Sequence, residues 1–251
     1  MAAPSAPIES SAAGPTGGFA RVIGVLINPG PTFESIAAKP TWIIPILLSC
    51  VMAIVILMLF GSRVGWRSFM ERKLANNQQF EQMSPHDREA AMDRAVKIGT
   101  ISAYVIGPIA PILYALVAAA VLLAAFNLLA SARIGFITSL SIVSYGWVPF
   151  LLSGVLGIVL LLVKDPSTID LEHLVASNAG AFMSNDSPKW LLALATSLDL
   201  FVFWVLALLA IGYHKASPKK VSLGKSLAIV IGVWVIWVLL RVGSAGAFGG
   251  G

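Results

Sequence analysis

One acidic residue, Asp199, lies inside a long apolar stretch of this sequence, between Leu198 and Leu200. If the stretch spans a membrane, a charge there costs about 2.5–3.5 kcal/mol, so the residue faces helices or water, is protonated, or has a partner. Asp199 could therefore belong to a proton or cation path. It could equally be a neutral acid that hydrogen-bonds another helix, with Thr196 one turn away on the same face. We favour the second interpretation, because one acid without a partner in an apolar stretch makes a poor relay.

Further polar residues could join this acid. Ser144 and Tyr145 follow Ser139 and Ser141 at the start of another apolar stretch, which makes the start of that stretch polar. These side chains could line a water-filled cavity together with Asp199. They could equally hydrogen-bond back to their own helix.

Residue patterns of common enzyme classes are absent from the sequence. The three histidines, His86, His173 and His214, lie far apart in the chain, and Cys50 is its single cysteine. There is no HExxH, no GxSxG and no phosphate-binding GxxxxGK[ST] pattern. We therefore expect no catalytic site, no metal and no cofactor.

The composition is that of a protein that lies in lipid. Hydrophobic residues make up 57% of the 251 residues and charged residues 12%, against roughly 25% charged residues in a soluble domain. The net charge of +5 is explained by Lys and Arg at the ends of spanning helices, where they face lipid headgroups. The expected partner is the lipid bilayer, with other membrane proteins or a second copy of the chain as candidates. No nucleic acid is expected.

Five segments are long and apolar enough to span a membrane. A spanning helix needs about 20 apolar residues, because the hydrocarbon core of a bilayer is roughly 30 Å thick. The sequence therefore predicts an all-α, polytopic transmembrane bundle with five spans, within a membrane domain of residues 42–242. The predicted spans are residues 42–60, 101–129, 139–163, 190–212 and 225–240. In the second span, Gly107, Pro108 and Pro111 predict a kink or an interfacial turn.

The segment of residues 19–41, here called the leading segment, is amphipathic. Phe19, Val22, Ile23 and Leu26 have the spacing of one helix face, and Arg21 lies off that face. Such a helix is expected to lie in the membrane interface.

Three further segments outside the spans carry predictions, namely the first loop and the two tails. In the 61–99 loop, Ser84-Pro85-His86-Asp87 predicts the start of a helix that lies on the membrane surface or runs into the second span. Residues 1–18 and 243–251 are rich in small residues and are expected to form a disordered and a flexible tail.

Small residues recur every four positions in the fifth predicted span, at Gly224, Ala228 and Gly232. This spacing lets helix backbones approach closely. It favours packing within the bundle, and the alternative is contact with a second copy of the chain.

Two short motifs resemble those of a known family. Asn28, Pro29, Thr32 and Phe33, followed by Pro40 and Trp42, match a stretch that leads into the first span of bacterial YIP-family membrane proteins. Tyr145-Gly146-Trp147-Val148-Pro149-Phe150-Leu151 looks like the aromatic and proline motif of that family's third span. The resemblance covers roughly residues 19–242 and agrees with five spans.

The resemblance implies a membrane fold and an address, which we expect to be the bacterial inner membrane. Eukaryotic members of the family act in vesicle trafficking and bind prenylated Rab-type GTPases, but these residues identify no GTPase-binding surface. The leading expectation is therefore a membrane-organising or scaffolding protein without chemistry of its own. The alternative is a small transporter or channel-like protein with Asp199 near a proton or cation path.

Overall fold

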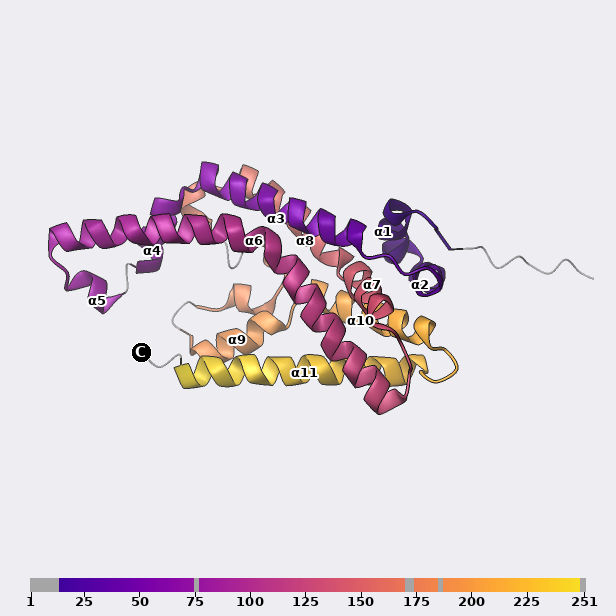
Figure 1. The fold of residues 1–251 in the computed structure, drawn as a ribbon. Helices are drawn as coiled ribbons and strands as arrows, with labels where there is room; N and C mark the ends of the chain where they lie inside the picture. The colour runs from indigo at the N-terminus through magenta and orange to yellow at the C-terminus, as the bar shows by residue number, and fades with distance from the viewer. Residues whose placement is uncertain (1–13, 75–76, 170–173, 185–186, 249–251) are drawn as a thin grey trace, which may run out of the picture.

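The computed structural model describes residues 14–74, 77–169, 174–184 and 187–248, and over these residues the chain is built from α-helices (Figure 1). The helices are α1 (Gly18–Ile27), α2 (Pro29–Ala38), α3 (Ile43–Arg63), α4 (Trp66–Leu74), α5 (Gln78–Glu81), α6 (Pro85–Ala130), α7 (Phe136–Gly146), α8 (Val148–Val163), α9 (Lys189–Ser197), α10 (Leu200–Ala216) and α11 (Leu223–Phe248). Two short 3-10 helices are η1 (Pro166–Thr168) and η2 (Ala179–Phe182). The predicted all-α class is confirmed.

Within the described part of the chain, four helices are long and apolar enough to cross a membrane. They are α3, α6, the α7–α8 pair taken together, and α11. These correspond to four of the five predicted spans. The other, residues 190–212, is not one helix, because it is divided at Leu198 and Asp199 into α9 and α10. Both pieces pack along α11, and a fifth crossing made of the two together stays a prediction.

The longest helix, α6, begins where the sequence predicts. The backbone N–H of Asp87 donates to Ser84 Oγ at 3.2 Å, and Pro85 lies in the first turn. The helix then runs without interruption into the second predicted span, which decides between the two alternatives for this segment. It bends near its middle (Figure 1), where Pro108 and Pro111 lie. Each proline lacks a backbone donor and pushes against the preceding turn, which bends a helix.

The core of the protein is centred on α7. Every residue from Ser139 to Gly146 is buried, and α7 packs against α2, α6 and α10. Ser139 Oγ donates to the carbonyl of Ala119 at 2.7 Å and is hydrogen-bonded to the Tyr213 hydroxyl. The Tyr213 ring stacks on Phe126, with 4.1 Å between ring centroids. These contacts join α6, α7 and α10 through one buried polar group.

The third predicted span, residues 139–163, is divided by a break at Trp147. This residue lies between α7 and α8 with φ −88° and ψ 1°. Pro149 lies in the first turn of α8, where its missing N–H leaves no hydrogen bond unmade. The family-like motif around these two residues therefore marks the junction of α7 and α8.

Ordered structure extends into both of the segments that the sequence predicts to be tails. The helix α11 continues to Phe248, so the predicted flexible tail of residues 243–251 is wrong over residues 243–248, where α11 packs against α9 and Gly246 lies near Trp190. Near the other terminus, the carbonyl of Pro15 accepts hydrogen bonds from Arg21 and Ser35. The predicted disordered tail of residues 1–18 is therefore packed from residue 14 onward. Residues 1–13 and 249–251 lie outside the described residues.

The spanning helices give the protein two ends. The α1 end holds α1, α2, residues 131–135 and residues 217–222, at the right of Figure 1, and there Ser217 Oγ donates to the Ala132 carbonyl at 3.0 Å. The α4 end, at the left, holds α4, α5 and the beginning of α6.

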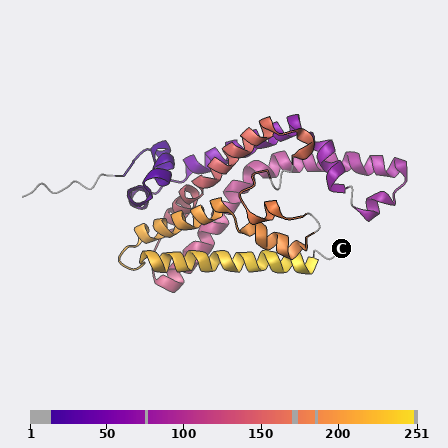
Figure 2. The ribbon, with the colours of Figure 1, turned by 180° about the vertical axis from the view of Figure 1, so that it is seen from behind.

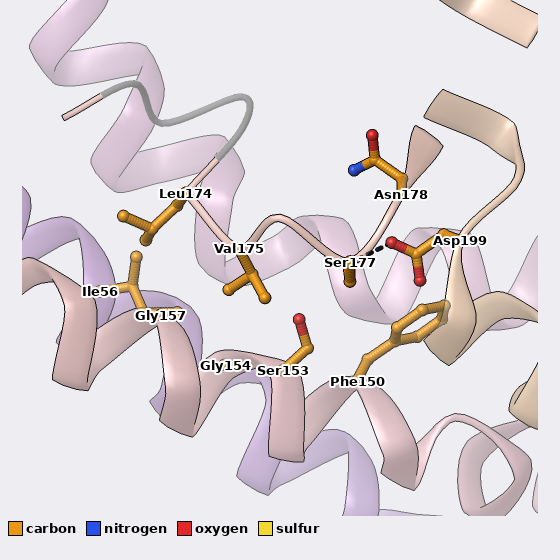
Figure 3. Close-up of a pocket in the computed structure, with 10 residues that line it drawn as sticks. All are labelled: Ile56, Phe150, Ser153, Gly154, Gly157, Leu174, Val175, Ser177, Asn178 and Asp199. Carbon is orange, nitrogen blue, oxygen red and sulfur yellow. Dashed lines mark hydrogen bonds between the residues drawn. The ribbon is translucent and has the colours of Figure 1, made fainter. Parts of the chain in front are cut away.

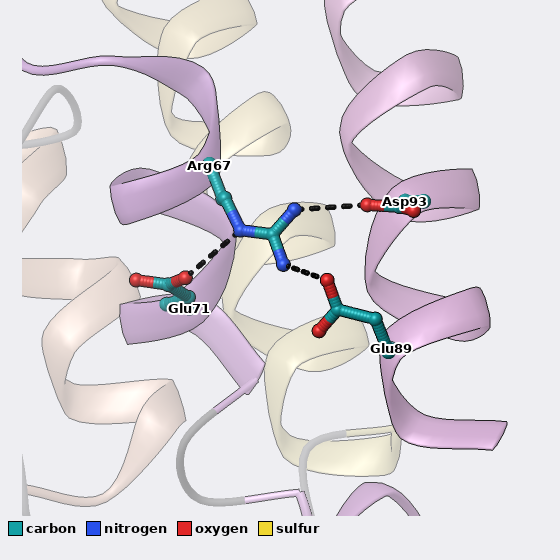
Figure 4. Close-up of polar contacts among 4 residues, drawn as sticks. All are labelled: Arg67, Glu71, Glu89 and Asp93. Carbon is teal, nitrogen blue, oxygen red and sulfur yellow. Dashed lines mark hydrogen bonds and ion pairs between the residues drawn. The ribbon is translucent and has the colours of Figure 1, made fainter. Parts of the chain in front are cut away.

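At the α4 end, one arginine joins α4 to α6 (Figure 4). Arg67 forms ion pairs with Glu71 (3.3 Å), Glu89 (2.6 Å) and Asp93 (2.8 Å). The hydrogen bonds from Arg67 to Glu89 and Asp93 raise the pKa of the guanidinium. All four side chains are about half exposed, so solvent screens the cluster and it positions α4 more than it stabilises the fold.

Candidate functional site

Asp199 lies at a helix break and not inside a continuous span. α9 ends at Ser197 and α10 begins at Leu200. Between them Asp199 has the extended backbone of an N-cap residue, with φ −115° and ψ 137°. The expected position in the middle of one helix is therefore wrong.

The break is held open by backbone pairing with residues 177–179. The N–H of Ala179 donates to the Leu198 carbonyl at 3.2 Å, and the N–H of Leu200 donates to the Ser177 carbonyl at 3.0 Å. These bonds form a short antiparallel bridge. The Leu198 carbonyl and the Leu200 N–H would otherwise form hydrogen bonds within a continuous helix. Because residues 177–179 take these groups, the apolar stretch divides into two helices here.

Both carboxylate oxygens of Asp199 have partners (Figure 3). Oδ1 accepts from the backbone N–H groups of Phe201 at 2.7 Å and Val202 at 3.2 Å. The Ser177 hydroxyl donates a short hydrogen bond to Oδ2. An aspartate in this place satisfies N–H groups of the first helical turn and lies at the positive end of the α10 dipole. The geometry thus supports a structural role for this carboxylate.

Thr196 does not accompany Asp199, although the sequence predicts that they share a helix face. Its hydroxyl donates to the Leu192 carbonyl at 2.8 Å, one turn back in α9. Its methyl group lies against Gly180 of η2, where an added Cβ would be 2.4 Å from that methyl carbon. Because the helix ends between the two residues, its periodicity no longer places them together.

Ser144 and Tyr145 also lie elsewhere. Ser144 is buried, and its Oγ donates to the Leu140 carbonyl at 2.6 Å. The Tyr145 hydroxyl is 3.4 Å from Thr41 Oγ1, near the leading segment. A cavity shared with Asp199 is therefore wrong, and the alternative of bonding back to the same helix is correct for the serine.

A hollow of about 360 Å³ lies beside Asp199 (Figure 3). Its wall comes from α3, α8 and the 174–178 segment. The lining residues are Ile56, Phe150, Ser153, Gly154, Gly157, Leu174, Val175, Ser177, Asn178 and Asp199. Asn178 Oδ1 accepts from the Ala181 N–H at 3.1 Å, whereas its Nδ2 and the Ser153 hydroxyl have no hydrogen-bond partner among the described residues. The hollow has room for several waters or a small molecule.

Metal ligands do not gather in the described residues: no group of three or more His, Cys, Asp or Glu side chains there is placed to hold an ion. His173 lies outside the described residues.

A second polar site, which the sequence did not predict, organises the leading segment. Arg21 is 2% exposed. Its Nη1 donates to the Lys39 carbonyl and to Thr41 Oγ1, both at 2.9 Å. Its Nη2 donates to the Ser35 carbonyl at 2.8 Å, and its Nε is shared between Ser35 Oγ at 3.2 Å and the Pro15 carbonyl at 3.1 Å. Each of the three nitrogens of the guanidinium therefore has a partner.

The end of a helix takes the place of a counter-ion for Arg21. No ion pair among the described residues includes it. The Ser35 and Lys39 carbonyls lie at the C-terminus of α2, where the helix dipole places partial negative charge, and the Ser35 carbonyl also accepts from the Lys39 N–H at 3.1 Å. Since Thr41 also contacts Tyr145, the same network fixes α1, α2 and the start of α3 against α7.

The family-like motif residues pack α2 onto the bundle. Pro29 lies in the first turn of α2, and Thr32 Oγ1 donates to the Asn28 carbonyl at 2.7 Å. Phe33 is fully buried, and an added Cβ at Gly212 of α10 would lie 3.0 Å from its ring. Pro40 and Trp42 then lead into α3, where Trp42 is the N-cap residue.

The helix α1 turns apolar side chains outward. Phe19, Ile23 and Ile27 are 63%, 59% and 78% exposed. Arg21 and Val25 face inward, and Val22 and Leu26 are half-buried, so the exposed face is rotated from the predicted one. Figures 1 and 2 show α1 and α2 lying across the ends of the spanning helices rather than along them. This arrangement supports the expected position in the membrane interface.

The small residues of α11 do not pack within the bundle. Gly224, Ala228 and Gly232 are exposed. A Cβ added to either glycine would meet no other atom within 4 Å. Contact of this stripe with a second copy or with another membrane protein stays a prediction.

We predict that Asp199→Ala and Asp199→Asn differ in stability. Alanine removes the cap of α10 and should lower the free energy of unfolding by about 0.5–2 kcal/mol, whereas asparagine keeps an acceptor oxygen for the same N–H groups. Unfolding of the purified protein in detergent, followed by denaturant titration, measures both. Equal losses in the two variants would show that the charge, and not the cap, is what matters.

We predict that Arg21→Met destabilises the leading segment. Methionine fills similar space but leaves the Ser35 and Lys39 carbonyls without this donor, which should cost about 1–3 kcal/mol. Limited proteolysis, together with the thermal unfolding midpoint in detergent, reports the change. Lys39→Met is the matched control, because that side chain is exposed and makes no hydrogen bond in the described structure. If both variants behave alike, the Arg21 network does not hold the segment.

Comparison with known proteins identifies the family. The model of the Yip1 domain matches residues 23–245, which covers both family-like motifs. No curated protein and no solved structure matches the chain. The long apolar helices and the match together make this chain an integral membrane protein of the Yip1 domain family.

Proposed function

We propose that this protein organises the membrane around it and acts through contacts with lipid and with other membrane proteins, without chemistry of its own. The carrying observation is the apolar face of α1, which consists of Phe19, Ile23 and Ile27. The bacterial inner-membrane location expected from the family resemblance is part of the same proposal.

The geometry of α1 supports this proposal physically. A helix that lies in the interface buries its apolar face among the headgroups and upper acyl chains of one leaflet. Because Arg21 ties α1 to α2 and to the start of α3, the helix cannot leave that depth independently of the spans. Several copies of the protein would then add area to one leaflet and alter its packing.

We predict that the wild-type protein changes the shape of vesicles and that Phe19→Ser with Ile23→Ser abolishes this effect. The double variant removes two exposed apolar side chains from α1 and leaves the Arg21 network in place. Vesicle diameter and tubulation, measured by electron microscopy over a range of protein-to-lipid ratios, test the prediction.

The matched control is Ile98→Ser with Ile101→Ser on α6, whose side chains are 65% and 55% exposed. This variant should reshape vesicles as the wild type does. Vesicles with wild-type protein that keep the size of protein-free vesicles would remove the proposal.

A small transporter or channel-like protein is the second candidate, and the hollow beside Asp199 favours it. The hollow places unpaired polar groups of Ser153 and Asn178 next to the one acid in the predicted spans. A proton or cation path through this region would use the carboxylate.

Flux measurements with Asp199→Asn separate the two candidates. The asparagine is expected to preserve the cap, so a loss of proton- or cation-driven flux in liposomes would report the carboxylate itself. We predict that the wild-type protein shows no flux above protein-free liposomes. Flux in the wild type that disappears in the Asn variant would establish the transporter instead.

A further inference from the structure

Charges are distributed differently at the two ends of the protein. At the α1 end, Glu34 is the one acidic residue in the described part of the chain. It is paired with Lys215, with 2.5 Å between Nζ and Oε1. At the α4 end, acids and bases are mixed, as the cluster around Arg67 shows. The α1 end therefore presents basic charge that is not balanced within the described protein.

Four exposed basic residues at this end form a group that we call the loop cations: Arg133, Lys219, Lys220 and Lys225. None has an ion-pair or hydrogen-bond partner for its side chain among the described residues. The bond between Ser217 Oγ and the Ala132 carbonyl, at 3.0 Å, holds the 131–135 and 217–222 loops side by side, and Lys225 follows in the first turn of α11. The cations are therefore concentrated on one surface.

Exposed apolar side chains flank the loop cations. Leu128 and Leu129, just before Arg133, are 81% and 67% exposed, and Leu223, close to Lys225, is 49% exposed. Apolar residues at the ends of spanning helices contact acyl chains, and basic side chains beside them extend to the headgroup level. A water-soluble acidic protein or a nucleic acid would leave these apolar neighbours uncovered. A lipid surface covers both kinds of side chain at once.

We propose that the loop cations bind the headgroups of anionic phospholipids, so that the α1 end of the protein selects acidic lipid. Near an anionic surface, each basic residue changes the affinity by about fivefold. This inference goes beyond the proposed function, because it concerns headgroup charge and not the insertion of α1. Each can fail while the other stands.

Lipid retention in native mass spectrometry tests the proposal. The protein in detergent is equilibrated with equal amounts of phosphatidylglycerol and phosphatidylcholine that carry the same acyl chains. The wild type should retain phosphatidylglycerol in preference. A variant with Arg133→Gln, Lys219→Gln, Lys220→Gln and Lys225→Gln should lose about tenfold or more of that preference.

The control removes four exposed basic residues that lie outside the α1 end: Arg94→Gln and Lys97→Gln on α6, Lys164→Gln after α8 and Lys189→Gln at the start of α9. It lowers the net charge by the same amount and should keep the wild-type preference. An equal fall in both variants, or no fall in the loop variant, would overturn the proposal. If the fourfold loop variant unfolds, Lys219→Gln with Lys220→Gln replaces it, and a preference unchanged in that variant counts against the proposal in the same way.

Free phosphate distinguishes the source of the anion. Excess inorganic phosphate, compared with chloride of the same ionic strength, should leave the preference for phosphatidylglycerol intact. Loss of the retained lipid in phosphate alone would assign the surface to a soluble phosphate compound and would overturn the lipid assignment.

Discussion

The guanidinium of Arg21 is enclosed by the protein, and its hydrogen bonds are made to carbonyl and hydroxyl groups rather than to a carboxylate. A buried cation is tolerated only when its donors are paired. Here the C-terminus of α2 supplies much of that pairing. Because the partners come from residue 15, from α2 and from the residues before α3, the fork of the guanidinium fixes three chain segments at once. The outward direction of Phe19 and Ile23 is a consequence of this constraint.

Hydropathy could predict the long helices, because length and apolar content are local properties of the sequence. It predicted α3, α11 and the apolar part of α6, and the Ser84 cap also followed from a local pattern. It failed at Asp199, because the break depends on backbone bonds to residues 177–179, about twenty positions earlier. An aspartate that precedes an apolar helix is itself an N-cap signal. Taken as the start of a helix at Asp199, this N-cap signal predicts two helices in residues 190–212 instead of one.

The residues of the predicted site do not lie together in the structure. The prediction that Thr196 lies beside Asp199 assumes one continuous helix, whereas the Thr196 hydroxyl bonds back within α9. For Ser144 the sequence leaves a cavity and a bond to its own helix open, and the structure has the bond. The role of Arg21 was missed, although the sequence offers a signal: it is the one charged residue between Glu9 and Glu34. A lone arginine in an apolar segment beside a helix end is a candidate for buried capping. Its partners are too far away in the chain to be read from spacing.

The position of Asp199 also limits what a path through the hollow could be. A proton carrier must alternate between a charged and a neutral carboxyl group. In this protein Asp199 Oδ1 accepts hydrogen bonds from two backbone N–H groups of α10, and Oδ2 accepts one from the Ser177 hydroxyl. These bonds tie the carboxylate to the start of α10 and to the 177–179 segment. A rearrangement of the carboxylate would therefore disturb a segment that forms part of the wall of the hollow. A group that holds its surroundings together in this way acts as a cap more readily than as a relay, which favours the membrane-organising function over the transporter.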